Sequence, residues 1–213
     1  QTEDAAEDYV TGIAATARHA SYLVCNLSSP NTPGLRSLQE KGPLRDIVQA
    51  VREALDSAGS AAGIYVKIAP DLTLEAVDDV VDVAVSEGAT GIIASNTTIR
   101  PELKAKYGEW WRGQAGGLSG NDAEFRAMST AQIAHIYRQA PDELTLIGVG
   151  GVKDAATALE KILAGASAVQ LVTAMRGEGL GVANAIKRGL LDWMERYGIN
   201  QLADARGIHA DSN

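Results

Sequence analysis

The sequence alternates short apolar runs with longer amphipathic segments, and this alternation restricts the fold more than any other feature. Five runs are rich in apolar or β-branched residues, at 22–25, 64–68, 91–94, 144–149 and 168–172. Each run is nearly continuous, which is typical of parallel strands covered on both faces. The alternation therefore predicts a parallel α/β fold.

The segments between these runs carry apolar residues three and four positions apart, which indicates helices with one buried face. The predicted faces are Leu44, Ile47, Val48, Val51 and Leu55; Leu74, Val77, Val81 and Ala84; Ala158, Ile162 and Leu163; and Val182, Ile186, Leu190 and Met194. We expect Asp154 to cap the third helix and Gly198 to end the fourth.

The N-terminal segment predicts one further helix, with Tyr9, Val10, Ile13 and Ala17 on it, leading into the first strand. Residues 2–8 resemble a helix already under way, and the first residue is Gln1 rather than Met. We therefore expect the chain to be a piece of a longer protein.

Small and polar residues follow the predicted strands. They are residues 26–29 after the first strand, 95–98 after the third, Gly150 and Gly151 after the fourth, and Thr173 after the fifth. A (β/α) barrel builds its active site from such positions. A doubly wound dinucleotide-binding sheet would place G-x-G-x-x-G after its first strand, and the sequence has none there. These positions favour the barrel.

Composition excludes several classes of function. A formal net charge of −8 and the absence of a basic block argue against a nucleic-acid partner. The single cysteine, Cys25, excludes an intrachain disulfide and a multi-cysteine metal site, and its place in a strand predicts an inert buried thiol. His19, His135 and His209 do not follow strands, so we interpret them as surface or structural residues. No apolar run approaches the roughly 20 residues of a membrane span.

The segment 148–151, Gly-Val-Gly-Gly, and Thr173 follow neighbouring late strands. Barrels often bind a phosphate between the loops after strands 7 and 8, and glycine lets backbone N–H groups approach it. The alternative is a tight turn without a ligand. We expect Asp154 to face away from an anion bound here.

Lys67 lies inside the second predicted strand, where an unpaired lysine is costly to bury. At the top of a barrel interior it could act as a nucleophile or stabilise a developing anion. The alternative is an edge lysine whose amine reaches water.

Three amides, Asn26, Asn31 and Asn96, lie near strand ends and could pair with a pyrimidine or flavin edge, although each alone is more often a turn residue or a cap. The loop 28–34, Ser-Ser-Pro-Asn-Thr-Pro-Gly, is stiffened by two prolines. Trp110 and Trp111 either cover the barrel mouth or anchor a long loop.

Taken together, these motifs resemble the class 2 dihydroorotate dehydrogenases. The resemblance begins at 26–36, Asn-Leu-Ser-Ser-Pro-Asn-Thr-Pro-Gly-Leu-Arg, which is similar to the family's active-site loop. It continues in order through 66–72, 94–98, 116–120, 148–151 and 170–174, over nearly the whole chain.

The resemblance implies an FMN-dependent (β/α)₈ barrel that oxidises (S)-dihydroorotate to orotate in pyrimidine synthesis. Class 1 enzymes of the family carry a cysteine base in this loop, where this sequence has Ser29. The serine implies the quinone-reducing class, which associates peripherally with the cytoplasmic face of the cell inner membrane through an N-terminal helical extension.

The resemblance also implies roles for individual residues. Ser29 would be the catalytic base that takes the proton from C5 of dihydroorotate while a hydride leaves C6 for the flavin. The substrate would be held by Asn26, Asn31, Asn96 and Thr97, and FMN by Asn26, Lys67, Ser95, Gly120, Gly151, Val172 and Thr173.

Three departures from the family pattern accompany this resemblance. Val172 stands where the family has tyrosine or a similar residue, and the loop 175–179 is shorter than usual. The family's membrane helices and first three βα units have no counterpart here. We therefore expect one domain over residues 1–213 that holds about five of the barrel's eight strands, since complete barrels have ~250 residues.

Two alternatives stay open beside this interpretation. One is another FMN barrel oxidoreductase with a different electron acceptor. The other is a partial barrel that is inactive by itself, because open sheet edges and an exposed apolar interior favour aggregation.

Overall fold

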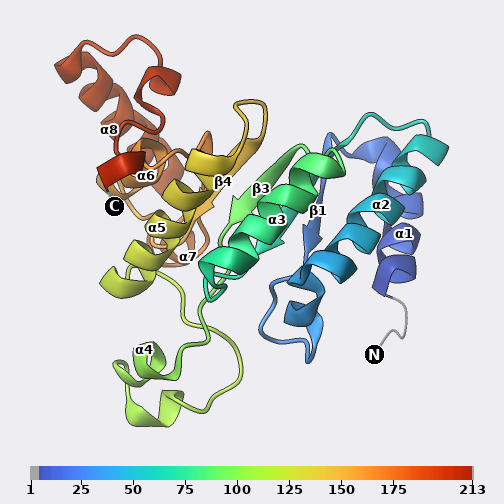
Figure 1. Cartoon of the computed structure of the whole chain (residues 1–213). Coiled ribbons are helices and arrows are strands. Elements are labelled where there is room, and N and C mark those ends of the chain that lie inside the picture. Colours follow the sequence, from blue (N-terminus) through green and yellow to red (C-terminus); the bar gives the residue numbers. More distant parts are fainter. Residues whose placement is uncertain (1–4, 213) are drawn as a thin grey trace.

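The computed structural model describes residues 5–212, and its core is one five-stranded parallel sheet (Figure 1). The strands are β1 (Tyr22–Asn26), β2 (Gly63–Ile68), β3 (Gly91–Ala94), β4 (Thr145–Val149) and β5 (Ala168–Gln170), in the spatial order β1-β2-β3-β4-β5. All five predicted strands are confirmed, except for Leu144 at the start of the fourth and the last two residues of the fifth. Because consecutive strands are neighbours and the order never reverses, the sheet is a segment of a (β/α)₈ barrel rather than a doubly wound sheet.

Helices connect the strands. They are α1 (Ala5–Thr16), α2 (Lys41–Ser57), α3 (Leu74–Ser86), α4 (Pro101–Ala105), α5 (Ala123–Gln139), α6 (Ala155–Leu163), α7 (Thr173–Glu178) and α8 (Val182–Tyr197), with 3₁₀ turns η1 (Ala17–His19), η2 (Leu35–Gln39), η3 (Glu109–Trp111), η4 (Leu202–Ala205) and η5 (Ala210–Ser212). The predicted N-terminal helix is confirmed from Ala5, and its expected start at residues 2–4 lies outside the described residues.

The two faces of the sheet differ in burial. Cys25, Val66, Ile92 and Leu146 are partners across four strands, and all are buried beneath the helices. In the next register row, Asn26 is exposed and Lys67 is only partly buried. The prediction that both faces are covered is therefore wrong for β1 and β2, whereas it holds for β3, whose four residues are all buried. Helices α2, α3 and α5 cover the outer face only (Figure 1).

Most predicted helix faces are confirmed. All five apolar positions of α2 are buried. On α3, Val77, Val81 and Ala84 are buried, but Leu74 is 57% exposed because it is the first residue of the helix and lies beyond the sheet contact. Leu163 and Met194 are partly buried.

Both predicted helix ends are also confirmed. The Asp154 carboxylate accepts the N–H of Thr157 at 2.9 Å, and the Thr157 hydroxyl accepts the N–H of Asp154 at 3.1 Å. These two reciprocal bonds form a capping box. Gly198 ends α8 in the left-handed conformation at φ 65°, which costs glycine little.

Helix α5 is the element for which the sequence predicted no apolar face. Its buried side includes Phe125, Ile133 and Ile136, but also Ser129 and Gln132. The polar residues are hydrogen-bonded: the Ser129 hydroxyl donates to Val149 O at 2.5 Å and the Gln132 amide to Ala69 O at 3.0 Å. A face that binds the sheet partly through hydrogen bonds has weak apolar periodicity, so hydrophobic spacing does not show it.

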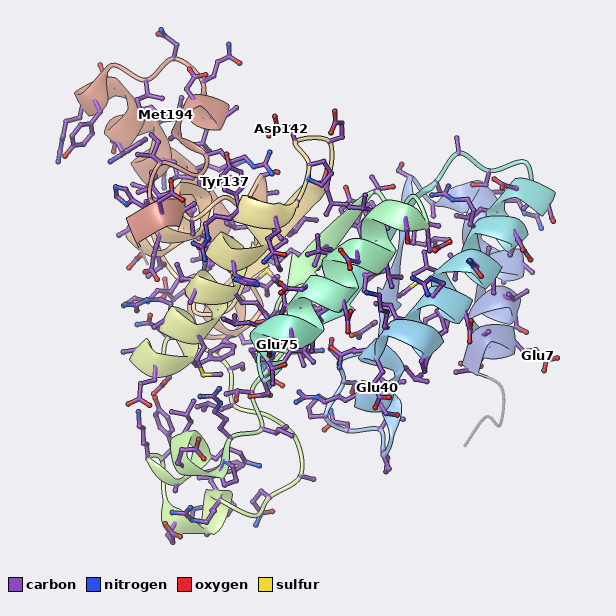
Figure 2. All side chains as sticks on the ribbon, in the orientation of Figure 1. Glu7, Glu40, Glu75, Tyr137, Asp142 and Met194 are labelled. Carbon is purple, nitrogen blue, oxygen red and sulfur yellow. The ribbon has the colours of Figure 1, made fainter. Side chains whose placement is uncertain are left out.

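Tyr137 of α5, labelled in Figure 2, contacts the C-terminal segment. The Tyr137 hydroxyl donates to Arg206 O at 3.4 Å, and the Arg206 guanidinium lies 5.0 Å from the centre of the tyrosine ring. The contact combines a hydrogen bond with a cation–π interaction and closes residues 202–212 against α5 and α6.

A long excursion between β3 and α5 carries α4 and η3 and projects from the body of the molecule (Figure 1). Trp110 and Trp111 stack with ring centres 4.1 Å apart, and both are exposed, Trp110 by 62%. Among the residues that the structure describes, no helix combines the length and apolar character needed to cross a bilayer.

Candidate active site

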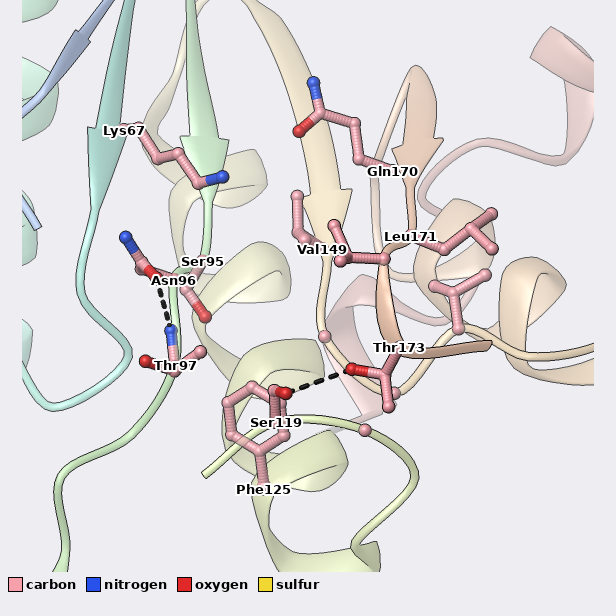
Figure 3. Close-up of a pocket in the computed structure, with 15 residues that line it drawn as sticks. Lys67, Ser95, Asn96, Thr97, Ser119, Phe125, Val149, Gln170, Leu171 and Thr173 are labelled. Carbon is pink, nitrogen blue, oxygen red and sulfur yellow. Dashed lines mark hydrogen bonds between the residues drawn. The ribbon is translucent and has the colours of Figure 1, made fainter. Parts of the chain in front are cut away.

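A pocket lies at the carboxyl ends of the strands, where the sequence placed the site (Figure 3). It is lined by Lys67, Ser95, Asn96, Thr97, Ser119, Gly120, Phe125, Val149, Gly150, Gly151, Val152, Gln170, Leu171, Val172 and Thr173. The cavity measures about 190 Å³. This is below the roughly 300–1,000 Å³ of a complete small-molecule site, so a larger ligand would extend past these residues.

The backbone after β3 fixes three of the predicted residues. Ser95 N donates to Val149 O at 3.1 Å and Asn96 N donates to Ile68 O at 2.9 Å, so the chain stays bonded to both neighbouring strands past the end of β3. The side chains of Ser95, Asn96 and Thr97 consequently line the pocket. The hydroxyls of Ser95 and Thr97 are buried and have no hydrogen-bond partner within residues 5–212. A buried hydroxyl without a protein partner is costly, so both hydroxyls are candidates to bind a polar group of a ligand or a water molecule.

Asn26 reaches this group through a chain of hydrogen bonds. The Ser28 hydroxyl donates to Asn26 Oδ1 at 3.0 Å and accepts from Asn96 Nδ2 at 3.0 Å. Asn96 Oδ1 in turn accepts the Thr97 N–H at 2.8 Å. The side-chain amides at the ends of β1 and β3 are thereby held in fixed orientations.

Lys67 points from β2 toward the pocket, as Figure 3 shows. Its side chain is about half-buried, and burial lowers the pKa of its amine. Lys67 makes no hydrogen bond or ion pair with the part of the chain described here. The prediction that it faces the barrel interior is confirmed, and the interpretation as an edge lysine is wrong because β2 lies between β1 and β3.

The glycines and Thr173 form the opposite wall. Gly120 and Gly151 have φ values of 93° and 77°, which disfavour any side chain, and a Cβ on Gly120 would lie 3.1 Å from Thr173 Cγ2. The Ser119 and Thr173 hydroxyls are 3.0 Å apart. Val172 is 63% exposed and can offer only its backbone as a polar group. Asp154, as expected, is used as a helix cap.

Three predicted residues, Asn26, Ser29 and Asn31, lie outside the pocket lining. The Ser29 hydroxyl accepts the Asn31 N–H at 3.3 Å, and a Cβ on Gly116 would meet Asn31 Oδ1 at 3.4 Å. Ser29 and Asn31 belong to the loop between β1 and η2, at the same end of the sheet as the pocket. Their predicted contacts with substrate stay predictions.

The interpretations of Cys25 and His135 agree with the structure. Cys25 is buried, and burial raises the pKa of its thiol to about 12, so the thiol is unreactive at neutral pH. No cluster of metal-ligating side chains occurs in residues 5–212. His135 lies on α5 and contacts Asp78 at 2.6 Å, away from the pocket.

Several residues at this end of the sheet received no role from the sequence. They are Ser28, Arg36, Asp71, Ser119 and Phe125. Arg36, Asp71 and Ser119 fall inside the motifs at 26–36, 66–72 and 116–120, which was the available signal. Their place in these motifs did not show which other residues these three side chains would contact.

Fold and site together define a (β/α) barrel protein whose small-molecule site lies at the strand carboxyl ends. The family model described as dihydroorotate dehydrogenase matches residues 1–194. The chain belongs to the dihydroorotate dehydrogenase family.

Individual relatives agree with this assignment. The chain is 45% identical to dihydroorotate dehydrogenase (quinone) of Rhodospirillum rubrum over 99% of its length and 57% of that protein. It is 47% identical to the protein of the same name from Streptomyces coelicolor, over 96% of this chain and 56% of that one. A crystal structure of DHODH from Eimeria tenella in complex with ferulenol superposes with a TM-score of 0.88 and 37% identity, over 98% of this chain and 59% of that chain. The chain thus spans a little over half the length of these relatives.

Proposed function

We propose that the complete protein containing this chain oxidises (S)-dihydroorotate to orotate with FMN and passes the electrons to a quinone, in pyrimidine synthesis. The relatives named above carry the name dihydroorotate dehydrogenase (quinone). The observation that carries the proposal is the convergence of Lys67, Ser95, Asn96, Gly120 and Thr173 from separate segments onto one pocket.

The pocket residues fit FMN. The buried, unpartnered Ser95 hydroxyl and the half-buried Lys67 amine both need a polar partner. Gly120 and Gly151 leave room for a close approach of backbone to ligand, and Thr173 begins a helix beside them. Lys67, Ser95 and Gly120 would hold the ring system, and Gly151, Val172 and Thr173 the phosphate. Bound FMN supplies the two-electron acceptor for the oxidation.

The chain's own groups supply orientation and proton transfer. Asn26, Asn31, Asn96 and Thr97 bind and orient dihydroorotate, and Ser29 removes the proton from C5. A serine hydroxyl is a weak base, so it passes the proton onward or becomes activated when its loop closes over the substrate. The positive charge of Lys67 offsets negative charge that develops on the acceptor.

We also propose that the complete protein sits peripherally on the cytoplasmic face of the cell inner membrane. Quinones dissolve in membranes, so an enzyme that reduces one must reach the bilayer surface. Fractionation of cells tests this proposal: the protein should sediment with membranes and be released by detergent. Recovery of the protein in the cytosolic fraction at low salt would oppose it.

The proposed activity is tested on the complete gene product. We expect dihydroorotate-dependent reduction of a short-chain quinone, and we expect Ser29→Ala to lower kcat by about 100-fold or more while flavin stays bound. Fumarate or NAD reduction without quinone reduction would instead support a barrel oxidoreductase with another acceptor. Wild-type kcat in Ser29→Ala would remove the role assigned to Ser29.

A second experiment measures FMN binding and activity of the 213-residue chain alone. The pocket is small, and β1 and β5 are the edges of the sheet. We expect this piece alone to bind FMN poorly and to be inactive, because open sheet edges favour aggregation and the small pocket does not enclose a larger ligand. A stable yellow monomer made from these residues alone would contradict that expectation.

A further inference from the structure

Arg36 joins three separate segments at the active-site end of the sheet. Its Nε donates to Ser28 O at 3.1 Å, one Nη donates to Asp71 Oδ2 at 2.8 Å, and the other donates to Thr97 O at 2.8 Å. The side chain is only 19% exposed. The guanidinium thus ties the loop after β1 to the loop after β2 and the loop after β3.

Asp71 provides the second half of this connection. Its carboxylate accepts from Arg36 and from Ile99 N at 3.1 Å, and it also accepts the Thr98 hydroxyl. Arg100 lies 3.8 Å away. Asp71 is 17% exposed, so the partly desolvated pair is stronger than a surface ion pair.

The two backbone oxygens that Arg36 holds belong to functional loops. Ser28 precedes Ser29, and the Ser28 hydroxyl bridges Asn26 and Asn96. Thr97 lines the pocket. Arg36 and Asp71 themselves do not line it, and their polar atoms are engaged by the contacts described above.

We propose that Arg36 and Asp71 are positioning residues that hold Ser29 in register with Asn96 and Thr97. The planar guanidinium serves three acceptors in one fixed geometry, which a lysine ammonium does not reproduce. The proposal rests on the function proposed above, because it assigns the pair to proton removal by Ser29.

The test compares Arg36→Lys, Asp71→Asn and Arg45→Met in the complete, flavin-loaded protein. Arg45 pairs with Glu87 on the outer helices at 3.2 Å and serves as the control for loss of an ion pair. Anaerobic mixing with dihydroorotate measures the rate of flavin reduction across pH. A displacement of about 1 Å can cost about 100-fold in rate. We therefore expect flavin reduction to slow by about that factor in Arg36→Lys and by less in Asp71→Asn, with flavin content unchanged and Arg45→Met like wild type.

Two readouts separate positioning from general damage. In Arg36→Lys, the reduction rate should keep rising with pH where the wild-type rate levels off, because solvent hydroxide then takes the C5 proton in place of the displaced serine. Amide hydrogen exchange of the flavin-free protein should become faster at residues 27–34 and stay unchanged in α2.

The possible outcomes decide between the two proposals. If wild type shows no flavin reduction by dihydroorotate, the proposed function fails. If wild type is active and both Arg36→Lys and Asp71→Asn stay within threefold of it, the positioning role is wrong. It is also wrong if rate, flavin content and melting temperature fall together in both variants, since that pattern denotes loss of folding. If Arg36→Lys alone unfolds, Asp71→Asn, which keeps Arg36, decides by the same criteria.

Discussion

The hydroxyl oxygens of Ser119 and Thr173 lie 3.0 Å apart, although 54 residues separate them in the chain. The contact places Gly120 against Thr173 at the wall of the pocket. It joins the excursion after β3 to the start of α7 and brings the two candidate flavin-binding segments into one site.

The first prediction concerns Gly120. In Gly120→Ala the new Cβ would lie 3.1 Å from Thr173 Cγ2, in a backbone conformation with φ 93° that alanine rarely adopts. We expect the complete protein to lose most of its bound flavin, measured as the ratio of absorbance at 450 and 280 nm. Gly113→Ala is the control, since a Cβ there meets nothing within 4 Å. Equal flavin content in the two variants would contradict the assignment of Gly120 to the wall of the flavin pocket.

The second prediction concerns the charge of Lys67. Because this half-buried amine faces the pocket without a partner among residues 5–212, replacing it with methionine should disfavour an anionic reduced flavin. We expect Lys67→Met to lower the midpoint potential by roughly 30 mV or more, which equals about 1.4 kcal/mol for two electrons. Spectroelectrochemical titration measures it, with the exposed Lys187→Met as control. An unchanged potential would place Lys67 away from the flavin.

The third prediction concerns Lys161, which is fully buried on α6. Its ammonium donates to Arg126 O at 2.9 Å and Thr130 Oγ1 at 2.6 Å. Burial lowers the pKa of Lys161 to about 7, although Glu160 opposes the shift. Between that pH and the unfolded pKa of about 10.4, the unfolded chain binds a proton that the folded chain has lost, so this lysine makes stability increase with pH.

Lys161→Met should remove that contribution. We expect the free energy of unfolding of wild type, minus that of Lys161→Met, to rise between pH 7 and 8.5 with a slope of at most about 1.4 kcal/mol per pH unit. Urea titrations at several pH values measure the difference. A difference that stays flat or falls over this range would show that Lys161 keeps its proton in the folded protein.

The fourth prediction concerns the cap of α6. Asp154→Ala removes the carboxylate that accepts the Thr157 N–H. We expect a loss of about 1 kcal/mol in the free energy of unfolding, and a much smaller loss in Asp154→Ser, which can still cap. Urea unfolding compares both with Asp192→Ala on the exposed side of α8. A loss as large in Asp192→Ala would mean that charge rather than capping is responsible.

The sequence by itself determined the strands, most of the helices that cover them and the end of the sheet that carries the site. Apolar runs such as 64–68 and helix faces such as that of α2 depend on local periodicity, which a reader of the sequence can count. Caps and turns, at Asp154 and Gly198, are equally local. Because parallel strands end at a common edge, the polar residues after them were expected to meet.

Tertiary structure alone decided which of those residues meet and which face of the sheet is covered. Arg36 contacts Asp71 and Thr97 across 35 and 61 positions, and α5 binds the sheet partly through Ser129 and Gln132. Such contacts depend on strand register and loop path rather than on the spacing of residues along the chain. The motifs therefore contained Arg36 and Asp71, but only the side-chain geometry showed that this pair joins the loop after β1 to the loop after β3.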